Sequence, residues 1–404
     1  MTNLPRGNRV LIRSINRSAI LNAVKNNRPI GRADIARQTG LSPATVTSIT
    51  GELIAEELIF EKTPGDSSGG RPPILLDLNP RGGYVVGIKL MENQASGALT
   101  DLEASVLVRR SAVLLDNSPQ GVVDTVASLV DSLLSEGHIP HGRLLGVGVG
   151  LAGIIDSERS VLRQSPYFGW VDVPLREMLQ KQVKAQVSID NDVNTLTLAE
   201  MWFGHAKDEQ NFLILTIGRG VGLGIVFNNQ LYRGAGGGAG EFGHTIIDPN
   251  GPLCACGKHG CLEAYVSDPG LLRTAQRAHE KGDLPHSETI EEFIRLAEEG
   301  HPTAQSILSQ AGEILGQSIA NLINLTNPGC ILISGEGVRN GPWMFDAMQA
   351  AIRKHTQPPL LEDVEICIEP WGDEMWARGA ASLVLRELFE PPVHSSSLSM
   401  AANS

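Results

Sequence analysis

Apolar segments of strand length alternate with amphipathic helical segments along most of this chain, from residue 83 to about residue 390. Residues 84–90 (YVVGIKL) and 144–156 (LLGVGVGLAGIID) are apolar runs typical of buried strands, whereas residues 124–137 (DTVASLVDSLLSEG) space their apolar side chains as a helix does. Residues 211–227 and 329–337 continue the series. Strands that alternate with helices pack in layers. The pattern therefore predicts an α/β body with layered sheets.

The first 82 residues do not follow this alternation, and they differ from the body in charge. Residues 1–50 hold eight Lys and Arg against one acid, Asp34, for a net charge of +7. The first 80 residues carry +3 and the whole chain carries −12, so residues 81–404 carry −15. A basic head on an acidic body is typical of a protein that contacts a polyanion with one end only.

Three helices are predicted in the head, the last two joined by a glycine turn. Apolar spacing predicts a helix over residues 16–26, before Pro29, and a second helix that ends at Gly40, a residue suited to left-handed backbone. Ser42 can cap a third helix, and Pro43 fits its first position. A short helix, a glycine-containing turn and a longer helix with small polar residues at its start form the layout of a helix-turn-helix.

DNA contacts are expected from the start of the third helix and from the loop between two predicted strands, residues 58–63 and 73–78. Small side chains let a helix start approach base edges closely, and Ser and Thr hydroxyls can bond bases or phosphates. The two strands enclose a Gly-rich wing whose arginine could enter a minor groove. The expected DNA-contacting residues are Ser42, Ala44, Thr45, Thr47, Ser48 and Arg71. A head that packs against a partner protein is the alternative.

Three of the five cysteines lie within eight positions, in the pattern Cys254-x-Cys256-x4-Cys261. Five cysteines in 404 residues are too few for a disulfide scaffold, and their crowding indicates a metal site in a reducing compartment. His244 lies ten residues before the first of the three. Three thiolates and one imidazole complete a tetrahedral Zn²⁺ shell without an open position, which is typical of structural zinc. Free loop cysteines are the alternative.

A set of polar residues lies around this cysteine pattern and at the end of an apolar strand: Asn191, Asp192, Glu241, His244 and Glu263. Carboxylates accept hydrogen bonds from neighbouring sugar hydroxyls, and an amide both donates and accepts. Glu241 and Glu263 flank the metal-ligand residues, so a bound zinc would hold both in place. His244 could bind zinc through one ring nitrogen and direct the other toward a sugar hydroxyl.

Size and composition are those of a globular protein of two or three domains, with 42% hydrophobic and 19% charged residues over a length of 404. The sequence has no run of about 18 uncharged apolar residues, which excludes a membrane-spanning helix. Its basic start lacks the apolar stretch and the cleavage site of a secretory signal. We therefore expect a cytoplasmic protein without a membrane partner, and we expect the polar tail, residues 391–404, to be disordered.

These motifs resemble those of the ROK family (repressors, open reading frames and sugar kinases), and in particular its winged-helix repressor branch. Residues 218–267, GRGVGLGIVFNNQLYRGAGGGAGEFGHTIIDPNGPLCACGKHGCLEAYVS, carry the E-x-G-H and C-x-C-G-x-x-G-C-x-E motifs of that family. The resemblance extends from residue 1 to about residue 390. It implies an N-terminal winged helix-turn-helix, residues 1–82, followed by an α/β actin-like (ribonuclease H-like) two-lobed body, residues 83–390, with a structural zinc site.

The resemblance also implies lobe boundaries and ligands. Lobe one would comprise about residues 83–195 with the C-terminal helix, and lobe two about residues 196–377. The zinc ligands would be His244, Cys254, Cys256 and Cys261. The sugar ligands would be Gly153, Asn191, Asp192, Glu241, His244 and Glu263, and Asp192 falls where family kinases keep their catalytic base.

Family kinases begin the body with the phosphate loop D-I-G-G-T-K, whereas this chain has Lys89-Leu90-Met91-Glu92-Asn93-Gln94. Lys89 replaces the acid that helps hold Mg²⁺, and Met91 and Glu92 replace glycines that let the backbone approach phosphate. Arg219 and Glu336 depart from the family pattern in two glycine-rich turns. Phosphoryl transfer depends on positioning and charge neutralisation, so the loop changes should slow it by a factor on the order of thousands. We expect no kinase activity.

The expected function is a sugar-responsive DNA-binding transcriptional regulator, a repressor of carbohydrate uptake or catabolism genes that binds a monosaccharide between its lobes without phosphotransfer. We expect a homo-oligomer, a dimer or a tetramer, on double-stranded operator DNA. Two alternatives stay open. One is a hexose or hexosamine kinase with a fused DNA-binding head, and the other is a repressor whose signal is a partner protein.

Overall fold

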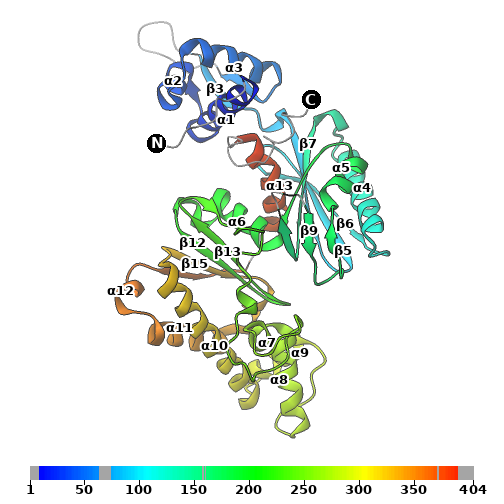
Figure 1. The fold of residues 1–404 in the computed structure, drawn as a ribbon, viewed down its shortest axis with the longest axis vertical. Coiled ribbons are helices and arrows are strands. Elements are labelled where there is room, and N and C mark those ends of the chain that lie inside the picture. The colour runs from blue at the N-terminus through cyan, green and yellow to red at the C-terminus, as the bar shows by residue number, and fades with distance from the viewer. Residues whose placement is uncertain (1–8, 63–73, 157–158, 160, 371–372, 390–404) are drawn as a thin grey trace. The chain divides into compact units, whose positions relative to one another are not determined.

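The computed structural model describes residues 9–62, 74–156, 159, 161–370 and 373–389. The chain forms two compact units: residues 1–195 with 376–404 (unit one), and residues 196–375 (unit two). It leaves unit one within helix α6 (Asp192–Phe203) and returns near the start of helix α13 (Asp373–Phe389). Figure 1 shows the helices and strands of each unit.

Unit one begins with a small module of three helices and a three-stranded antiparallel sheet. Its elements are α1 (Arg9–Asn27), β1 (Ile30–Gly31), α2 (Arg32–Thr39), α3 (Pro43–Ala55), β2 (Ile59–Lys62) and β3 (Leu75–Leu78), with the strand order β1-β3-β2. Helix α2 ends at Gly40, whose φ of 70° is left-handed. The Ser42 hydroxyl accepts a hydrogen bond from the N–H of Thr45 and so caps α3, with Pro43 in its first position. The predicted helix, glycine turn and capped helix are confirmed.

The main sheet of unit one is mixed and has the strand order β11-β7-β4-β5-β6. Its strands are β4 (Tyr84–Leu90), β5 (Gln94–Thr100), β6 (Val106–Val113), β7 (Leu144–Leu151) and β11 (Gln186–Asn191). Strands β11, β7 and β4 pair in parallel, whereas β4, β5 and β6 pair antiparallel. Helices α4 (Pro119–Glu136) and α5 (Leu175–Val183) alternate with these strands, as the sequence pattern predicts.

Residues 144–156, predicted as one buried strand, form two strands in different sheets. Strand β7 ends at Leu151, and β8 (Ile154–Asp156) joins β9 (Val161–Gln164) and β10 (Val171–Val173) in the order β10-β9-β8. Gly153 lies between β7 and β8 with a φ of 144°, and a Cβ there would lie 2.3 Å from the carbonyl oxygen of Gln164. Only glycine adopts such a backbone readily, so the apolar run turns into the second sheet at this residue.

Helices cover both faces of the main sheet of unit one. Side chains such as Ile88 face the apolar cluster that includes α4 and α5. Alternate residues of a strand face the opposite side, and there the sheet meets α13. A Cβ on Gly87 would lie 2.2 Å from the carbonyl oxygen of Ala377, and one on Gly148 would lie 1.7 Å from that of Ala380. Glycine at these two positions therefore lets α13 pack directly on β4 and β7.

Replacing Gly148 by alanine is expected to lower the free energy of unfolding of unit one by about 3 kcal/mol, because the new methyl must displace the backbone of α13. Urea unfolding monitored by tryptophan fluorescence measures the change. Gly142→Ala is the matched control, since a Cβ on Gly142 meets no atom within 4 Å, and it should shift the unfolding free energy by less than about 0.5 kcal/mol. Equal stability of the two variants would contradict the close helix–sheet approach.

Unit two is built on a second five-stranded sheet, with the strand order β14-β13-β12-β15-β16. Its strands are β12 (Phe212–Ile217), β13 (Val221–Phe227), β14 (Gln230–Leu231), β15 (Cys330–Ser334) and β16 (Glu365–Ile368). One face joins an apolar cluster with α10 (Pro302–Thr326) and α11 (Gly341–His355). The other face meets α6, where a Cβ on Gly224 would lie 1.9 Å from Oγ1 of Thr197.

The remaining helices of unit two are α7 (Glu263–Val266), α8 (Asp268–Glu280), α9 (Ile290–Glu298) and α12 (Pro358–Leu361). Apolar side chains of α8 and α9 join the same cluster as α10 and α11. None of the helices in the described part of the chain combines the length and the apolar character needed to cross a membrane.

Candidate functional site

The side of α3 that faces solvent carries most of the residues predicted to contact DNA. Ala44, Thr47 and Ser48 are exposed on the helix, and Ser42 is exposed just before it. Thr45 is half-buried, because its hydroxyl lies 2.8 Å from the hydroxyl of Ser42 and helps to shape the helix start. The opposite side of α3 packs in the head through the buried residues Val46, Ile49 and Leu53. Arg71, the predicted wing contact, lies outside the described residues.

Several arginines of the head are paired with acids. Arg13 forms an ion pair with Glu52 on α3, and Arg17 forms one with Glu56 just after it. Arg32 lies 2.8 Å from the carboxylate of Glu61 on β2. These three acids are among the six in residues 51–80 that, against two basic residues there, lower the net charge from +7 over residues 1–50 to +3 over the first 80 residues. In the described part of the head, the exposed start of α3 therefore carries small polar side chains, and part of the positive charge is compensated by ion pairs.

The head contacts the last helix of the chain within unit one. The hydroxyl of Ser18 on α1 donates to the carbonyl oxygen of Leu388, at 3.4 Å. Nζ of Lys25 lies 4.7 Å from the ring centroid of Phe389, the last residue of α13. Helix α13 therefore contacts the main sheet along its length and the head at its end.

Four potential metal ligands converge in unit two. His244, Cys254, Cys256 and Cys261 each place one donor atom within 4.8 Å of the others. Nδ1 of His244 lies 3.7 Å from Sγ of Cys254, and Sγ of Cys256 lies 3.6 Å from Sγ of Cys261. Donor atoms in a tetrahedral zinc site with Zn–S of about 2.3 Å and Zn–N of about 2.0 Å are separated by roughly 3.6–3.8 Å. The donor set and its spacing therefore fit one zinc ion. We call this loop, residues 244–261, the cysteine loop.

Backbone hydrogen bonds shape the cysteine loop. The N–H of Gly257 donates to the carbonyl oxygen of Cys254 (3.0 Å), and the N–H of Cys254 donates to that of Lys258 (2.8 Å). Gly257 and Gly260 have φ values of 86° and 71°, and a Cβ on Gly260 would lie 1.6 Å from the carbonyl oxygen of Asp248. Such backbone favours glycine, so the two glycines make the tight turn that brings the cysteines together.

The environment of the cysteine loop keeps its buried thiols protonated in the absence of a cation. Burial raises the pKa of Cys254 to about 12, and it also raises the pKa of Cys261. Zinc binds the thiolate form. A bound metal ion, as the largest local charge, inverts this effect and deprotonates a coordinating thiol.

Two carboxylates adjoin the cysteine loop. Nε2 of His244 lies 3.8 Å from Oε2 of Glu241, so the imidazole presents one nitrogen to the cysteines and the other to a carboxylate. Glu263 begins α7, and its Oε2 accepts a hydrogen bond from the N–H of Val221 at 3.0 Å. Oε1 of Glu263 lies 3.8 Å from Sγ of Cys254. Three of the predicted sugar ligands thus lie around the cysteine loop.

The other three predicted sugar ligands, Gly153, Asn191 and Asp192, lie in unit one. Nδ2 of Asn191 donates to the carbonyl oxygen of Gly153 at 3.1 Å. Oδ1 of Asn191 accepts from the N–H groups of Val193 (2.8 Å) and Asn194 (3.3 Å), which fixes the side chain at the start of α6. Asp192, the first residue of α6, is half-buried. The end of β11 and the start of α6 therefore hold an amide and a carboxylate next to each other.

Residues 89–94, which the sequence comparison aligns with the phosphate loop of family kinases, include a hairpin turn. The N–H of Met91 donates to the carbonyl oxygen of Gln94 at 2.9 Å, which closes the turn between β4 and β5. Nζ of Lys89, near the end of β4, lies 3.8 Å from the ring centroid of Trp376 on α13. A cation at this distance from an indole face is attracted by the ring quadrupole. Lys89 thus links β4 to α13 through a cation–π contact.

A carboxylate lies against the glycine turn between β12 and β13. This turn is closed by the N–H of Gly218, which donates to the carbonyl oxygen of Gly220 at 3.1 Å. A Cβ on Gly218 would lie 2.5 Å from Oε2 of Glu336. Glu336 begins the short helix η5 (Glu336–Asn340), directly after Gly335, whose φ is 96°. The glycine-rich turn at residues 218–220 and the one at residues 335–337 therefore lie next to each other, with the Glu336 carboxylate between them.

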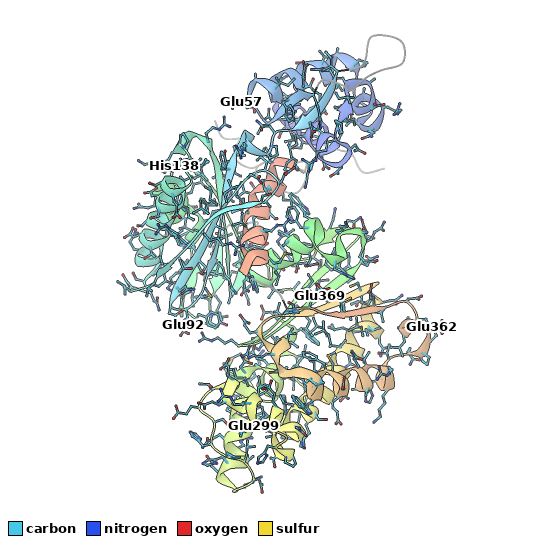
Figure 2. All side chains as sticks on the ribbon, turned by 180° about the vertical axis from the view of Figure 1, so that it is seen from behind. Glu57, Glu92, His138, Glu299, Glu362 and Glu369 are labelled. Atoms are coloured by element: carbon cyan, nitrogen blue, oxygen red, sulfur yellow. The ribbon has the colours of Figure 1, made fainter. Side chains whose placement is uncertain are left out.

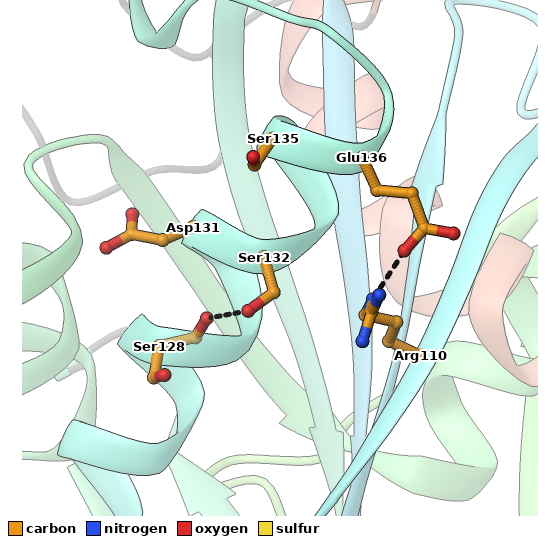
Figure 3. Close-up of a pocket in the computed structure, with 6 residues that line it drawn as sticks. All are labelled: Arg110, Ser128, Asp131, Ser132, Ser135 and Glu136. Atoms are coloured by element: carbon orange, nitrogen blue, oxygen red, sulfur yellow. Dashed lines mark hydrogen bonds and ion pairs between the residues drawn. The ribbon is translucent and has the colours of Figure 1, made fainter.

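An open pocket lies between α4 and β6 of unit one (Figure 3). Its lining residues are Arg110, Ser128, Asp131, Ser132, Ser135 and Glu136. Arg110 pairs with Glu136, and the hydroxyl of Ser132 donates to the carbonyl oxygen of Ser128 at 2.8 Å. None of these six residues belongs to the predicted sites.

The sequence reasoning missed two features of the structure. Trp376, which contacts Lys89, is distant along the chain, and no local pattern indicates their contact. A second group of potential metal ligands includes Glu365 and Cys367. Their alternate spacing on a short apolar strand was a signal that could have drawn attention to one face of that strand.

Comparisons with known proteins agree with this architecture. Residues 85–387 match the model of the ROK family, and residues 13–59 match a model described as winged helix-turn-helix DNA-binding. The xylose repressor of Bacillus spizizenii is 31% identical over 380 residues, which cover 94% of this chain and 97% of that protein.

Solved structures show the same division. A ROK family transcriptional regulator, described as a homologue of the E. coli MLC protein, has a TM-score of 0.84 at 28% identity, covering 94% of this chain and 97% of that one. A ROK family glucokinase from Streptomyces griseus, in complex with glucose and AMPPNP, has a TM-score of 0.63 at 25% identity and covers 74% of this chain and 99% of its own. The ROK family model matches most of the sequence, and the winged helix-turn-helix model matches the residues before it. The chain therefore belongs to the ROK family.

Proposed function

We propose that this protein is a sugar-responsive transcriptional repressor that binds operator DNA through its head. The observation that carries the proposal is that a winged helix-turn-helix precedes a ROK body in one chain. Nearly the whole chain, 94% of it, aligns with a xylose repressor. The exposed start of α3 would enter the major groove, and the wing would contact the adjacent minor groove. The proposed DNA-contacting residues are Ser42, Ala44, Thr45, Thr47, Ser48 and Arg71.

The proposed signal is a monosaccharide, and each unit offers groups that can form hydrogen bonds with sugar hydroxyls. Unit one offers the carboxylate of Asp192, together with the amide of Asn191 and the backbone of Gly153, and the last two are linked by a hydrogen bond. Unit two offers Glu241, His244 and Glu263 around the cysteine loop. We propose that zinc, held by His244, Cys254, Cys256 and Cys261, is structural: it fixes the loop that carries these sugar ligands. A relative with the same body, the S. griseus glucokinase, was solved with glucose.

Phosphotransfer is not part of the proposal. Lys89 stands where family kinases have a metal-binding acid, and its ammonium group is engaged with Trp376. Glu336 brings a negative charge to the glycine turn at Gly218. A nucleotide phosphate at that turn would meet a like charge in place of the neutralising groups that phosphoryl transfer requires. Asp192 would then serve as a hydroxyl acceptor rather than as a base.

Two copies would place their heads on a palindromic operator, with the spacing set by the contacts between the bodies. A sugar can release such a complex only if it binds the DNA-competent and DNA-incompetent states with different affinity. Helix α13 is suited to connect the two events, because it packs on the main sheet of unit one and contacts α1 at its end.

Fluorescence anisotropy with duplexes from the region upstream of the protein's own gene tests this function. The titration is made at one fixed salt concentration, since protein–DNA affinity depends steeply on salt, with and without a panel of monosaccharides. Tight binding that one sugar releases is the expected result. Binding that no sugar alters, but that a partner protein does, would replace the sugar signal by a protein. A coupled assay with ATP, Mg²⁺, hexoses and hexosamines should show no turnover, and measurable phosphorylation would make the protein a kinase with a DNA-binding head.

Glu263→Gln is expected to weaken sugar binding about 10- to 100-fold, because a hydrogen bond to a charged group is worth about 1.5–3 kcal/mol. Calorimetric titration with the sugar that releases DNA measures the loss, and operator binding without sugar should be unchanged. Glu299→Gln, an exposed glutamate at the end of α9 in the same unit (labelled in Figure 2), is the matched control and should bind sugar normally. Unaltered affinity in Glu263→Gln would remove this residue from the sugar site.

A further inference from the structure

A second group of potential metal ligands lies in unit two, apart from the cysteine loop. His205, Glu365 and Cys367 place one donor atom each within 4.8 Å of one another. His205 begins the short helix η3 (His205–Asp208) after α6, whereas Glu365 and Cys367 lie on β16, the edge strand of the sheet. The group therefore joins two segments that are about 160 residues apart in sequence.

The alternation of β16 explains how its donors come together. Residues two apart on a strand point to the same face, so Glu365, Cys367 and Glu369, just beyond the end of the strand, share one side. His205 lies over that side: its Nε2 is 3.5 Å from Sγ of Cys367 and 3.5 Å from Oε1 of Glu365. The thiol of Cys367 and the carboxylate of Glu365 thus both lie next to the same imidazole nitrogen of His205.

The distances are those of a metal site. In a tetrahedral zinc site the nitrogen and sulfur ligands are separated by roughly 3.6 Å, and the nitrogen and oxygen ligands by roughly 3.4 Å, given Zn–S of about 2.3 Å and Zn–N and Zn–O of about 2.0–2.2 Å. Both separations measured from Nε2 of His205 are 3.5 Å. The third separation, between Sγ of Cys367 and Oε1 of Glu365, is within 4.8 Å, so one ion could be reached by all three donors.

The surroundings hold His205 in the orientation that such an ion needs. Nδ1 of His205 lies 3.9 Å from Oε1 of Glu369, and a carboxylate behind the second ring nitrogen is the usual support of a metal-binding histidine. The backbone N–H of His205 donates to Oε2 of the buried Glu200 at 2.9 Å. A Cβ on Gly204 would lie 1.9 Å from the same oxygen, so the residue before the histidine must be small. The ligand is therefore positioned from both its ring and its backbone.

We propose that His205 Nε2, Cys367 Sγ and Glu365 Oε1 form a second site for a divalent transition metal, with Zn²⁺ as the cation that this donor set favours. Three protein ligands leave a fourth position for water. The site goes beyond the proposed repressor function and does not depend on it. The chain enters unit two after Thr195 and leaves it before Trp376. His205 lies soon after the entry, and Glu365 and Cys367 lie shortly before the exit. A bound ion would tie these two segments together within unit two.

Cobalt titration of the full-length protein, reduced and with the metal of the cysteine loop left in place, tests the site. Wild type should take up one Co²⁺ per chain with a near-ultraviolet thiolate-to-cobalt band. Cys367→Ser should lose the band, and His205→Asn should bind Co²⁺ at least 10-fold more weakly. Glu362→Gln, an exposed glutamate at the end of α12, is the matched control and should titrate as wild type does (Glu362 and Glu369 are labelled in Figure 2). Hydrogen exchange at residues 200–208 and 365–369 should slow with the metal in wild type alone.

Other outcomes overturn the site. Equal uptake by wild type and Cys367→Ser would mean adventitious surface binding. A band that survives Cys367→Ser but is abolished by Cys256→Ser would place the cobalt in the cysteine loop. Circular dichroism of Cys367→Ser without added Co²⁺ separates loss of the site from loss of the fold. The charge-removing variant Glu365→Gln, which keeps the thiol and imidazole, should also weaken binding. Without added Co²⁺ and with the metal of the cysteine loop in place, neither variant is expected to alter operator or sugar binding, so failure of this site is distinguishable from failure of the repressor function.

Discussion

Ala44→Glu is expected to abolish operator binding, with at least a 100-fold loss of affinity, while the protein stays folded. Ala44 is exposed in the first turn of α3, on the side that we expect to face the major groove. A carboxylate there would lie among phosphates and base edges, and like charges brought together in an interface cost several kcal/mol. A loss of about 2.7 kcal/mol already corresponds to 100-fold in affinity. Anisotropy at one salt concentration measures the change.

The same substitution should leave the head intact, because an acid in the first turn of a helix stabilises it by about 0.3–1 kcal/mol. Helix α4 offers a matched control in the body: Ser118 caps it, Pro119 is its first residue, and Gln120 stands where Ala44 stands in α3. Gln120→Glu adds the same charge at the equivalent helical position and should bind operator as wild type does. If Ala44→Glu bound DNA as well as Gln120→Glu, α3 would not be the recognition helix.

Cys256→Ser is expected to remove one zinc ion per chain and to abolish release of the operator by sugar. The side chain is exposed, so serine fills its place without a cavity. The loss follows from the chemistry of the site, because structural zinc contributes an apparent 10–16 kcal/mol to small zinc-dependent folds and a hydroxyl is a poor substitute for a thiolate ligand. Without the ion, the cysteine loop would no longer hold His244 and Glu263, and sugar affinity should fall at least about 10-fold.

The head lies in unit one, so Cys256→Ser should still bind operator when no sugar is present. Metal analysis by mass spectrometry, sugar calorimetry and anisotropy are the measurements. His259→Asn is the control, since His259 is exposed in the same loop and its Nδ1 lies 3.0 Å from the carbonyl oxygen of Gly251 rather than among the cysteines. Zinc content and sugar binding that both survive in Cys256→Ser would show that the proposed role of the metal is wrong.

Much of the fold could be predicted because its signals are local. Gly40, Ser42 and Pro43 end one helix and begin the next through their own backbone preferences, and the structure has those boundaries. The four residues of the metal cluster lie within 18 positions, and short-range turns at Gly257 and Gly260 are enough to bring them together. One local prediction was wrong: residues 144–156 form two strands of different sheets rather than one strand. The turn at Gly153 has no polar residues around it that would have indicated the change.

Local sequence patterns specify the modules and their chemistry: a winged head, a layered α/β body, and a cysteine loop flanked by carboxylates. The contacts of Lys89 with Trp376, of Glu336 with Gly218 and of His205 with Cys367 arise from the tertiary fold. Each of these pairs spans more than 100 residues. Their meeting depends on strand order and helix docking, which are set by the burial of many side chains at once, and no short segment of the chain carries that information.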